Sequence, residues 1–221
     1  SRTCIYKMDI VNCLYPIVAI NMKKAFAYLI ILIPLISFSQ NWQIPEIDWE
    51  GKSETENNNI DLLKLKDRNS LIVEFGYSTY STNGQNLEFI VYQNDGKVKR
   101  FVVNQPNTTE KKTKIKRKKI KKKEYKYYWG FLNSCVKENK FKIEKSKLNI
   151  TEKKGIENGK ATVENMYISH RVKYHFWIYQ GKNYIAYGST SPKVYIENKF
   201  PGYKERQKLV DLINGFKSLS E

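Results

Sequence analysis

Histidine, cysteine and arginine are scarce in this chain of 221 residues, which contains two His, three Cys and six Arg. Histidine and cysteine supply many of the metal ligands and nucleophile–base pairs of enzymes, so their scarcity limits both kinds of site. The patterns GxSxG, GxGxxG, GxxxxGK[ST], HExxH and CxxC are also missing. We therefore expect no metal and no cofactor, and the sequence favours a binding protein over an enzyme.

Three side chains remain as weak candidates for catalysis: His170, His175 and Cys135. The two histidines are five residues apart on an expected strand, so their side chains point to opposite faces and are poorly placed to share one metal ion. Cys135 lies beside the apolar stripe of an expected helix, as a small core residue would. A nucleophilic Cys–His pair would require Cys135 to meet a histidine in space, which the sequence neither supports nor excludes.

Long hydrophobic runs are missing too. The longest run, Ala25 to Ile36, has twelve residues, whereas a membrane-spanning helix needs about 20. Two lysines precede this run and Ser37-Phe38-Ser39 follows it, which is the three-part pattern of a secretory signal peptide over residues 22–39. We therefore expect export by a Sec-type signal and a periplasmic or extracellular location. A retained N-terminal anchor and a buried helix of the fold are the alternatives.

The 21 residues before this segment have no export pattern. We interpret residues 1–21 as upstream reading frame ahead of a true start at Met22, with Met8 as the competing start. Removing residues 1–39 leaves 40–221, a length typical of one domain. Cys135 is then the single cysteine, so no internal disulfide is expected and stability must come from buried apolar contacts.

Acidic residues are outnumbered, with 22 Asp and Glu against 39 Lys and Arg, for a net charge of +17. They gather in an N-terminal arm, residues 40–69, where the stretch to Asp61 has six acids and one Lys, with Trp42 and Trp49 as anchors for packing. The positive charge gathers in residues 111–126, which hold eleven bases and one Glu. We expect the acidic arm and the basic insertion to neutralise each other in part.

The basic insertion has two competing interpretations. It is either a solvated loop whose like charges oppose compaction, or a patch for an anionic membrane or another polyanionic surface. Arginine, whose planar fork reads phosphate and guanine, is rare in this chain, which argues against specific binding to nucleic acid. The candidate residues for anionic-surface binding are Lys111, Lys112, Lys114, Lys116, Arg117, Lys118, Lys119, Lys121, Lys122 and Lys123.

Alternating hydrophobic residues predict strands over 71–77, 86–93 and 98–103, and again over 165–180 and 184–188. Apolar stripes at helical spacing predict helices over 126–139 and 203–219. Residues 70–221 should therefore form a single α+β domain, with the basic insertion inside it. We expect an antiparallel sheet of about four to five strands, built from two hairpins, with two amphipathic helices packed on one face.

Two classes of function follow from these features. The preferred one is an exported, non-catalytic binding or envelope-associated domain with a basic loop that contacts anionic surfaces. The alternative is a secreted basic hydrolase, similar to a nuclease, with His170 or His175 as its base and lysines that hold phosphate.

Overall fold

The computed structural model describes residues 42–52, 63, 70–79, 84–106, 112–169 and 171–219. The expected upstream frame and signal peptide, most of the acidic arm after Lys52, Lys111 and His170 lie outside the described residues. The described residues belong to one compact unit, which begins at Trp42.

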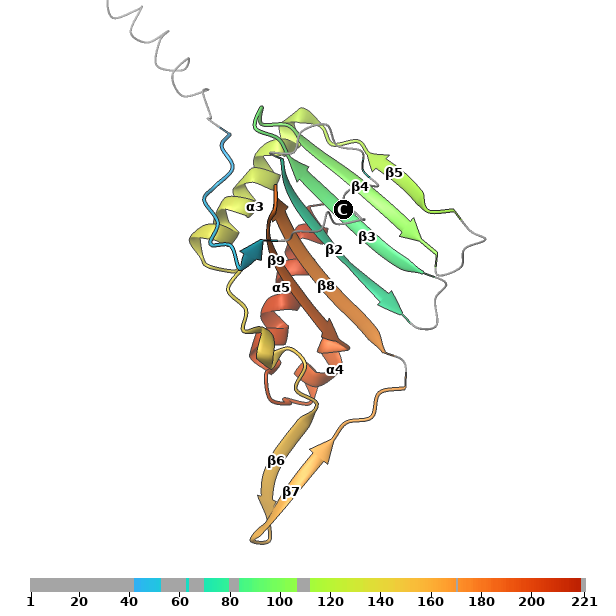
Figure 1. Cartoon of the computed structure of the whole chain (residues 1–221), viewed down its shortest axis with the longest axis vertical. Helices are drawn as coiled ribbons and strands as arrows, with labels where there is room; N and C mark the ends of the chain where they lie inside the picture. Colours follow the sequence, from blue (N-terminus) through green and yellow to red (C-terminus); the bar gives the residue numbers. More distant parts are fainter. Residues whose placement is uncertain are drawn as a thin grey trace, which may run out of the picture. The chain divides into compact units, whose positions relative to one another are not determined.

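A seven-stranded antiparallel sheet is the centre of this unit (Figure 1), with the strand order β1-β9-β8-β2-β3-β4-β5. The sheet consists of two groups of neighbouring strands, β2 to β5 and β1 with β8 and β9, which are joined where β2 pairs with β8. A separate two-stranded sheet is formed by β6 and β7. The strands are β1 (Gly51–Lys52), β2 (Leu71–Thr79), β3 (Gln85–Tyr92), β4 (Val98–Gln105), β5 (Lys114–Lys118), β6 (Glu152–Glu157), β7 (Lys160–Asn165), β8 (Val172–Gln180) and β9 (Asn183–Thr190).

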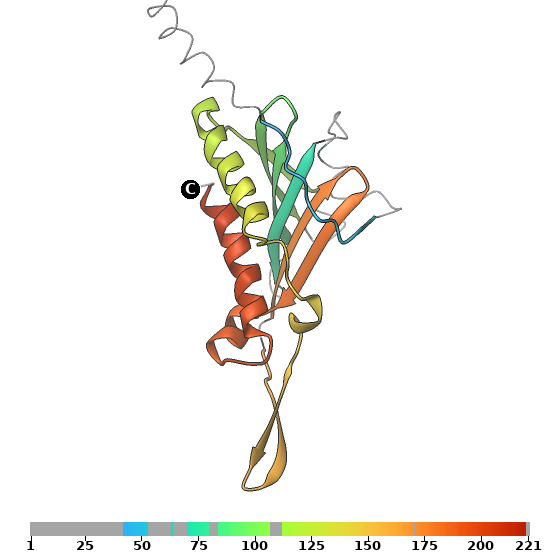
Figure 2. The same ribbon diagram turned by 90° about the vertical axis from the view of Figure 1, so that its left-hand side faces the viewer.

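Two long helices, α3 (Tyr125–Lys137) and α5 (Tyr203–Ser218), lie side by side against one face of the seven-stranded sheet (Figure 2). The short helix α4 (Pro192–Glu197) precedes α5, and single 3₁₀ turns cover Lys122–Glu124 and Lys145–Lys147. Both long helices turn an apolar stripe towards the strands, which is the reason that they pack there.

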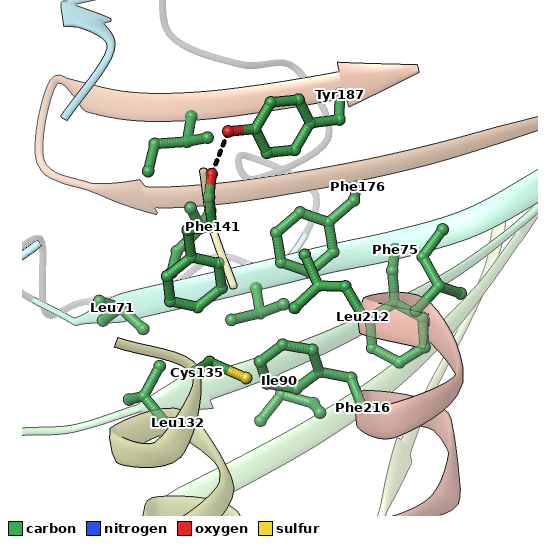
Figure 3. Packing of buried hydrophobic residues seen from close by; sticks show 14 of the residues in the cluster. Leu71, Phe75, Ile90, Leu132, Cys135, Phe141, Phe176, Tyr187, Leu212 and Phe216 are labelled. Carbon is green, nitrogen blue, oxygen red and sulfur yellow. Dashed lines mark hydrogen bonds between the residues drawn. The ribbon is translucent and has the colours of Figure 1, made fainter. Parts of the chain in front are cut away.

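The main core lies between these helices and the sheet (Figure 3). The ring of Phe216 on α5 lies 6.1 Å from Phe75 on β2 and 5.7 Å from Phe176 on β8, between ring centroids. Tyr187 on β9 donates a hydrogen bond to the Phe141 carbonyl. Each large apolar side chain buried in such a cluster stabilises the fold by about 2–3 kcal/mol.

The opposite face of the sheet is also buried over its central strands. Its cluster contains Leu63 and the strand residues Ile72, Leu87, Phe89, Val91, Val103 and Tyr179. Because both faces are covered, β2 and β3 carry nearly continuous hydrophobic runs in place of a simple alternation. We call this side the second face.

The structure confirms the α+β class and the antiparallel sheet. The expectation of two helices fits only roughly, because the short α4 is present in addition to α3 and α5. The expected strand number was too low, because β1 and β5 extend the two edges of the sheet. The interpretation of the basic insertion as a solvated loop was wrong for Lys114–Lys118, because these residues form β5. An edge strand needs burial on neither face, so it can consist largely of lysine.

Candidate functional site

The positive charge is organised by β5, the edge strand that pairs with β4 from Lys114 opposite Asn104 to Lys118 opposite Arg100. Side chains alternate along a strand, so Lys114, Lys116 and Lys118 share one face, at a spacing of about 7 Å. This face is the helix side of the sheet, because it is shared with Val98 of the main core.

Arg100 lies beside this row of lysines but does not add free charge to it. Its guanidinium donates to Glu88 Oε2 across the β3–β4 pair, at 2.6 Å from Nη2 and 3.0 Å from Nε. Within the described residues, no ion pair involves a basic side chain between Lys112 and Lys126. The row therefore presents its charge to solvent.

The chain after β5 stays basic and is tied to the core by half-buried Ile120. The lysines at 119, 121, 122 and 123 are exposed and lead into the N-terminus of α3, where the Lys121 backbone N–H donates to Glu124 Oε2 at 2.9 Å. Cations at a helix N-terminus oppose the helix dipole, at a cost of about 0.3–1 kcal/mol each. These lysines are therefore not explained by the stability of α3.

The described part of the acidic arm, residues 42–52, does not neutralise the basic row. Asp48 pairs with Lys142 at 3.2 Å and Glu50 pairs with Lys145 at 2.5 Å. β1 joins β9 at the sheet edge opposite β5. Trp42 is an anchor as expected, since its ring lies 5.7 Å from Trp129. Neutralisation in cis was therefore a wrong expectation for these residues.

His175 on β8 points to the second face, opposite Gly76 of β2. Its side chain is 13% exposed, and Nε2 has no hydrogen-bond partner and lies 3.8 Å from Oε1 of buried Glu74. The Tyr179 hydroxyl donates to Oε2 of Glu74 at 3.1 Å. Burial, with a smaller effect of Lys173, lowers the pKa of His175 to about 4. The imidazole is thus neutral at pH 7 and a weak base.

Cys135 lies on α3 and is fully buried in the main core (Figure 3). Burial raises the pKa of this thiol to about 12, so it is protonated and unreactive at neutral pH. Since Cys135 is on the helix side of the sheet and His175 is on the second face, they do not form a nucleophilic pair. His170 is outside the part of the chain that the structure describes.

Two features of the sequence pointed to elements that its hydrophobic periodicity did not predict. Lysine recurs at 112, 114, 116 and 118, the period of two that a strand requires, around Thr113, Ile115 and Arg117. Asn158-Gly159 is the pair typical of a tight hairpin and forms the turn between β6 and β7. Buried Arg206 on α5, which donates to the carbonyls of Leu148, Ile150 and Pro201, left no such signal.

Neither a membrane span nor a metal centre is found in the described ranges. No helix there combines the length and the apolar character needed to cross a bilayer. No group of three or more His, Cys, Asp and Glu side chains is placed there to hold a metal ion. In comparisons with known proteins, no family model matches the chain and no curated protein matches its sequence.

Proposed function

We propose that this chain is an exported, non-catalytic binding domain that holds a polyanion or an anionic membrane surface on its basic segment, Lys112–Lys126. The observation that carries the proposal is the row of three lysines on an edge strand, exposed Lys114 and Lys116 and half-buried Lys118, which no ion pair neutralises within the described residues. The location follows from the expected signal peptide at residues 22–39.

The strand gives the charges a fixed arrangement that a loop would lack. Neighbouring charges about 7 Å apart lie within one Debye length at physiological ionic strength, about 8 Å, so their potentials add. Lysine acts as a point charge and makes no planar fork, so attraction should depend on the charge density of the ligand and little on its sequence.

The alternative, a secreted hydrolase, requires His170 or His175 as its base. His175 is largely buried and has a lowered pKa, and its Nε2 has no hydrogen-bond partner that orients it. A general base should be poised near the operating pH and within reach of substrate. No observation on the described residues favours catalysis, so we keep binding as the function that the geometry supports best.

The binding test compares two triple variants of the full chain on heparin and on vesicles that contain anionic lipid. Lys114→Gln, Lys116→Gln and Lys118→Gln remove the row on β5, while Lys193→Gln, Lys199→Gln and Lys204→Gln remove three exposed charges near α4 and α5. The first variant should weaken binding and lower the slope of log K against log salt by about 2 to 3. The second should change both much less. Equal losses in both variants, or binding that resists salt, would contradict a site at β5.

Export is tested separately. Expression from Met22 in a bacterial host should give a product that begins at Gln40, because the short apolar core and Ser39 suit signal peptidase. Mass analysis of the N-terminus measures this directly. A protein that keeps residues 22–39 in the membrane fraction would support the anchored alternative.

A further inference from the structure

The hairpin β6–β7 pairs with no other strand of the described chain, because its two strands pair only with each other. It projects away from the seven-stranded sheet in both views (Figures 1 and 2). Its apolar residues are exposed, Ile156 by 81% and Val163 by 56%. An isolated two-stranded hairpin is marginally stable in water, so this element is a candidate for an intermolecular contact.

The hairpin is nevertheless held firmly at its base. Arg206 donates to the Leu148 carbonyl at 2.9 Å and to the Ile150 carbonyl at 2.5 Å, just before β6 begins. At the tip, Asn158 and Gly159 have φ of 51° and 75°, the two positive values that a type I′ turn requires. The strands are therefore positioned before any partner binds.

The register divides the hairpin into two faces. Ile156 lies opposite Ala161 and Lys154 opposite Val163, so these four residues share one face, which carries the apolar side chains of the hairpin. Lys153, Glu164 and Thr162 lie on the other face, where Lys153 Nζ is 3.3 Å from Glu164 Oε2. The free edge of β7 presents both faces to a new strand.

The charge of the hairpin fits a second copy of this chain. Residues 152–165 contain three Lys and three Glu and are neutral, whereas the chain as a whole carries +17. Two copies repel each other over most of their charged surface. Residues 152–165 contribute no net charge to that repulsion.

We propose that β7 of two copies pairs antiparallel about a two-fold axis at Thr162, which joins the hairpins into a four-stranded sheet. In this register Thr162 faces the second Thr162, Ala161 faces Val163, and Lys160 faces Glu164. The charges then alternate across the four strands as Lys153, Glu164, Lys160 and Glu157. The contact is self-complementary and closed, so it yields a dimer and no fibre.

Backbone geometry supports this register. In a two-residue hairpin the residues beside the turn exchange hydrogen bonds, and such pairs recur at every second residue. Lys160, Thr162 and Glu164 therefore direct their backbone groups to β6, while Ala161 and Val163 direct theirs outwards. The proposed register pairs Ala161 of one copy with Val163 of the other, so that their outward backbone N–H and C=O groups form hydrogen bonds between the copies. Lys160 and Glu164 fall at the closer, non-hydrogen-bonded positions, where cross-strand charges interact best.

The edge of β6 is less suited to the same contact. Gly155 occupies the middle of that strand, and a strand interior is weakened by glycine, which has no side chain to pack. We therefore assign the contact to β7.

Sedimentation of the full chain tests the dimer by charge exchange. Lys160→Glu places two Glu–Glu contacts across the axis, and Glu164→Lys places two Lys–Lys contacts there. Each variant alone should raise the dissociation constant of the dimer by about tenfold or more. An equimolar mixture restores opposite charges at both contacts, so it should form the heterodimer. The matched control Glu152→Lys makes the same charge change on β6, where the register has no partner residue, and should remain dimeric.

Proline supplies a second, charge-independent variant. The Val163 N–H points outwards, so Val163→Pro removes a donor of the intermolecular ladder while the β6–β7 ladder keeps its bonds. This variant should sediment as a monomer with the thermal stability of the domain unchanged. A wild-type chain that is monomeric at about 100 μM, single variants that dimerise as well as the wild type, or a mixture that stays monomeric would each overturn the proposal. These outcomes do not depend on anion binding at β5.

Discussion

Two polar side chains, fully buried Arg206 and largely buried His175, meet the cost of burial in different ways. Arg206 keeps its charge, because its guanidinium donates to the carbonyls of Leu148, Ile150 and Pro201 and lies 4.4 Å from the Tyr195 ring centroid. His175 has no hydrogen bond to Nε2 and is held in its neutral form. A buried side chain can keep its charge only where hydrogen bonds from the protein replace those to water.

Arg206 should therefore be the more sensitive of the two positions. Arg206→Ala removes the side-chain donor to the half-buried carbonyls of Ile150 and Pro201. It also removes one of two donors to the Leu148 carbonyl, which keeps the bond from the Ser189 hydroxyl. The change also empties a buried site and should lower the free energy of unfolding by about 3–5 kcal/mol. Arg206→Lys keeps the charge but not the planar fork, so it should recover only part of this loss. Urea denaturation measures both. Arg171→Ala, at an exposed position, is the control and should stay within about 0.5 kcal/mol.

The stability of the protein should depend on His175 between pH 6.5 and 4. The folded pKa of about 4 lies below the ordinary value of 6.5, so the unfolded chain takes up a proton in this range and the native state does not. The contribution is complete above pH 6.5 and falls as the pH drops, by up to about 3 kcal/mol. His175→Gln should remove this dependence.

Two measurements test the pKa of His175 and its effect on the stability of the fold. Denaturation of the wild type and of His175→Gln at several pH values gives the difference in stability, and an NMR titration gives the pKa of the imidazole. A measured pKa above 6.5 would contradict the account, since it would mean that the Glu74 carboxylate outweighs burial.

At the scale of elements, β5 combines the proposed binding face with protection of the sheet edge. An open edge strand offers unpaired backbone groups to other chains, and lysine on such a strand discourages edge-to-edge pairing. The hairpin β6–β7 shows the opposite composition, with balanced charge and exposed Ile156 and Val163. The edge at β5 is therefore suited to remain unpaired, whereas the edge at β7 is suited to pair with β7 of a second copy of the chain.

Removing the charge of β5 should make the protein aggregate. Lys114→Val, Lys116→Val and Lys118→Val turn the edge into a neutral strand of high β-propensity, so light scattering on mild heating should rise well above that of the wild type. The triple change of the same lysines to Glu keeps the edge charged and should stay soluble while losing heparin binding. Aggregation of both variants alike would show that charge does not protect this edge.

The elements that burial shapes were predictable from the sequence, and the exposed ones were not. Apolar residues recur at the period of the structure in β8, α3 and α5, and they form nearly continuous runs in β2 and β3, because one or both faces of these elements are covered. β5 and the hairpin β6–β7 bury little, so selection for a core left no apolar pattern in them.

At the scale of the whole molecule, the seven-stranded sheet is the middle layer between two apolar clusters. Phe216 belongs to the cluster on the helix side and Phe89 to the cluster on the second face. Both clusters depend on the same strands, so neither can lose its order without exposing the other. The described domain should therefore unfold as one cooperative unit.

Truncation of a buried side chain on either face of the sheet should lower the midpoint temperature of the same unfolding transition. Phe216→Ala and Phe89→Ala each remove a fully buried ring and should cost about 3–5 kcal/mol. Tyr127→Ala, at an exposed position of α3, should cost less than about 0.5 kcal/mol. Calorimetry and fluorescence follow the transition, and two separate transitions in either Phe variant would show that the clusters unfold independently.

The sequence by itself determined the α+β class, the central hairpins, the two long helices and the concentration of charge in residues 111–126, because local patterns of polarity encode each of these. Only the tertiary structure decided which residues meet. It placed Cys135 and His175 on opposite faces of one sheet and gave Arg206 its three carbonyl acceptors. It also set Asp48 beside Lys142 and Glu50 beside Lys145. These outcomes depend on strand order and register, which join segments far apart in the chain through contacts that no local pattern specifies.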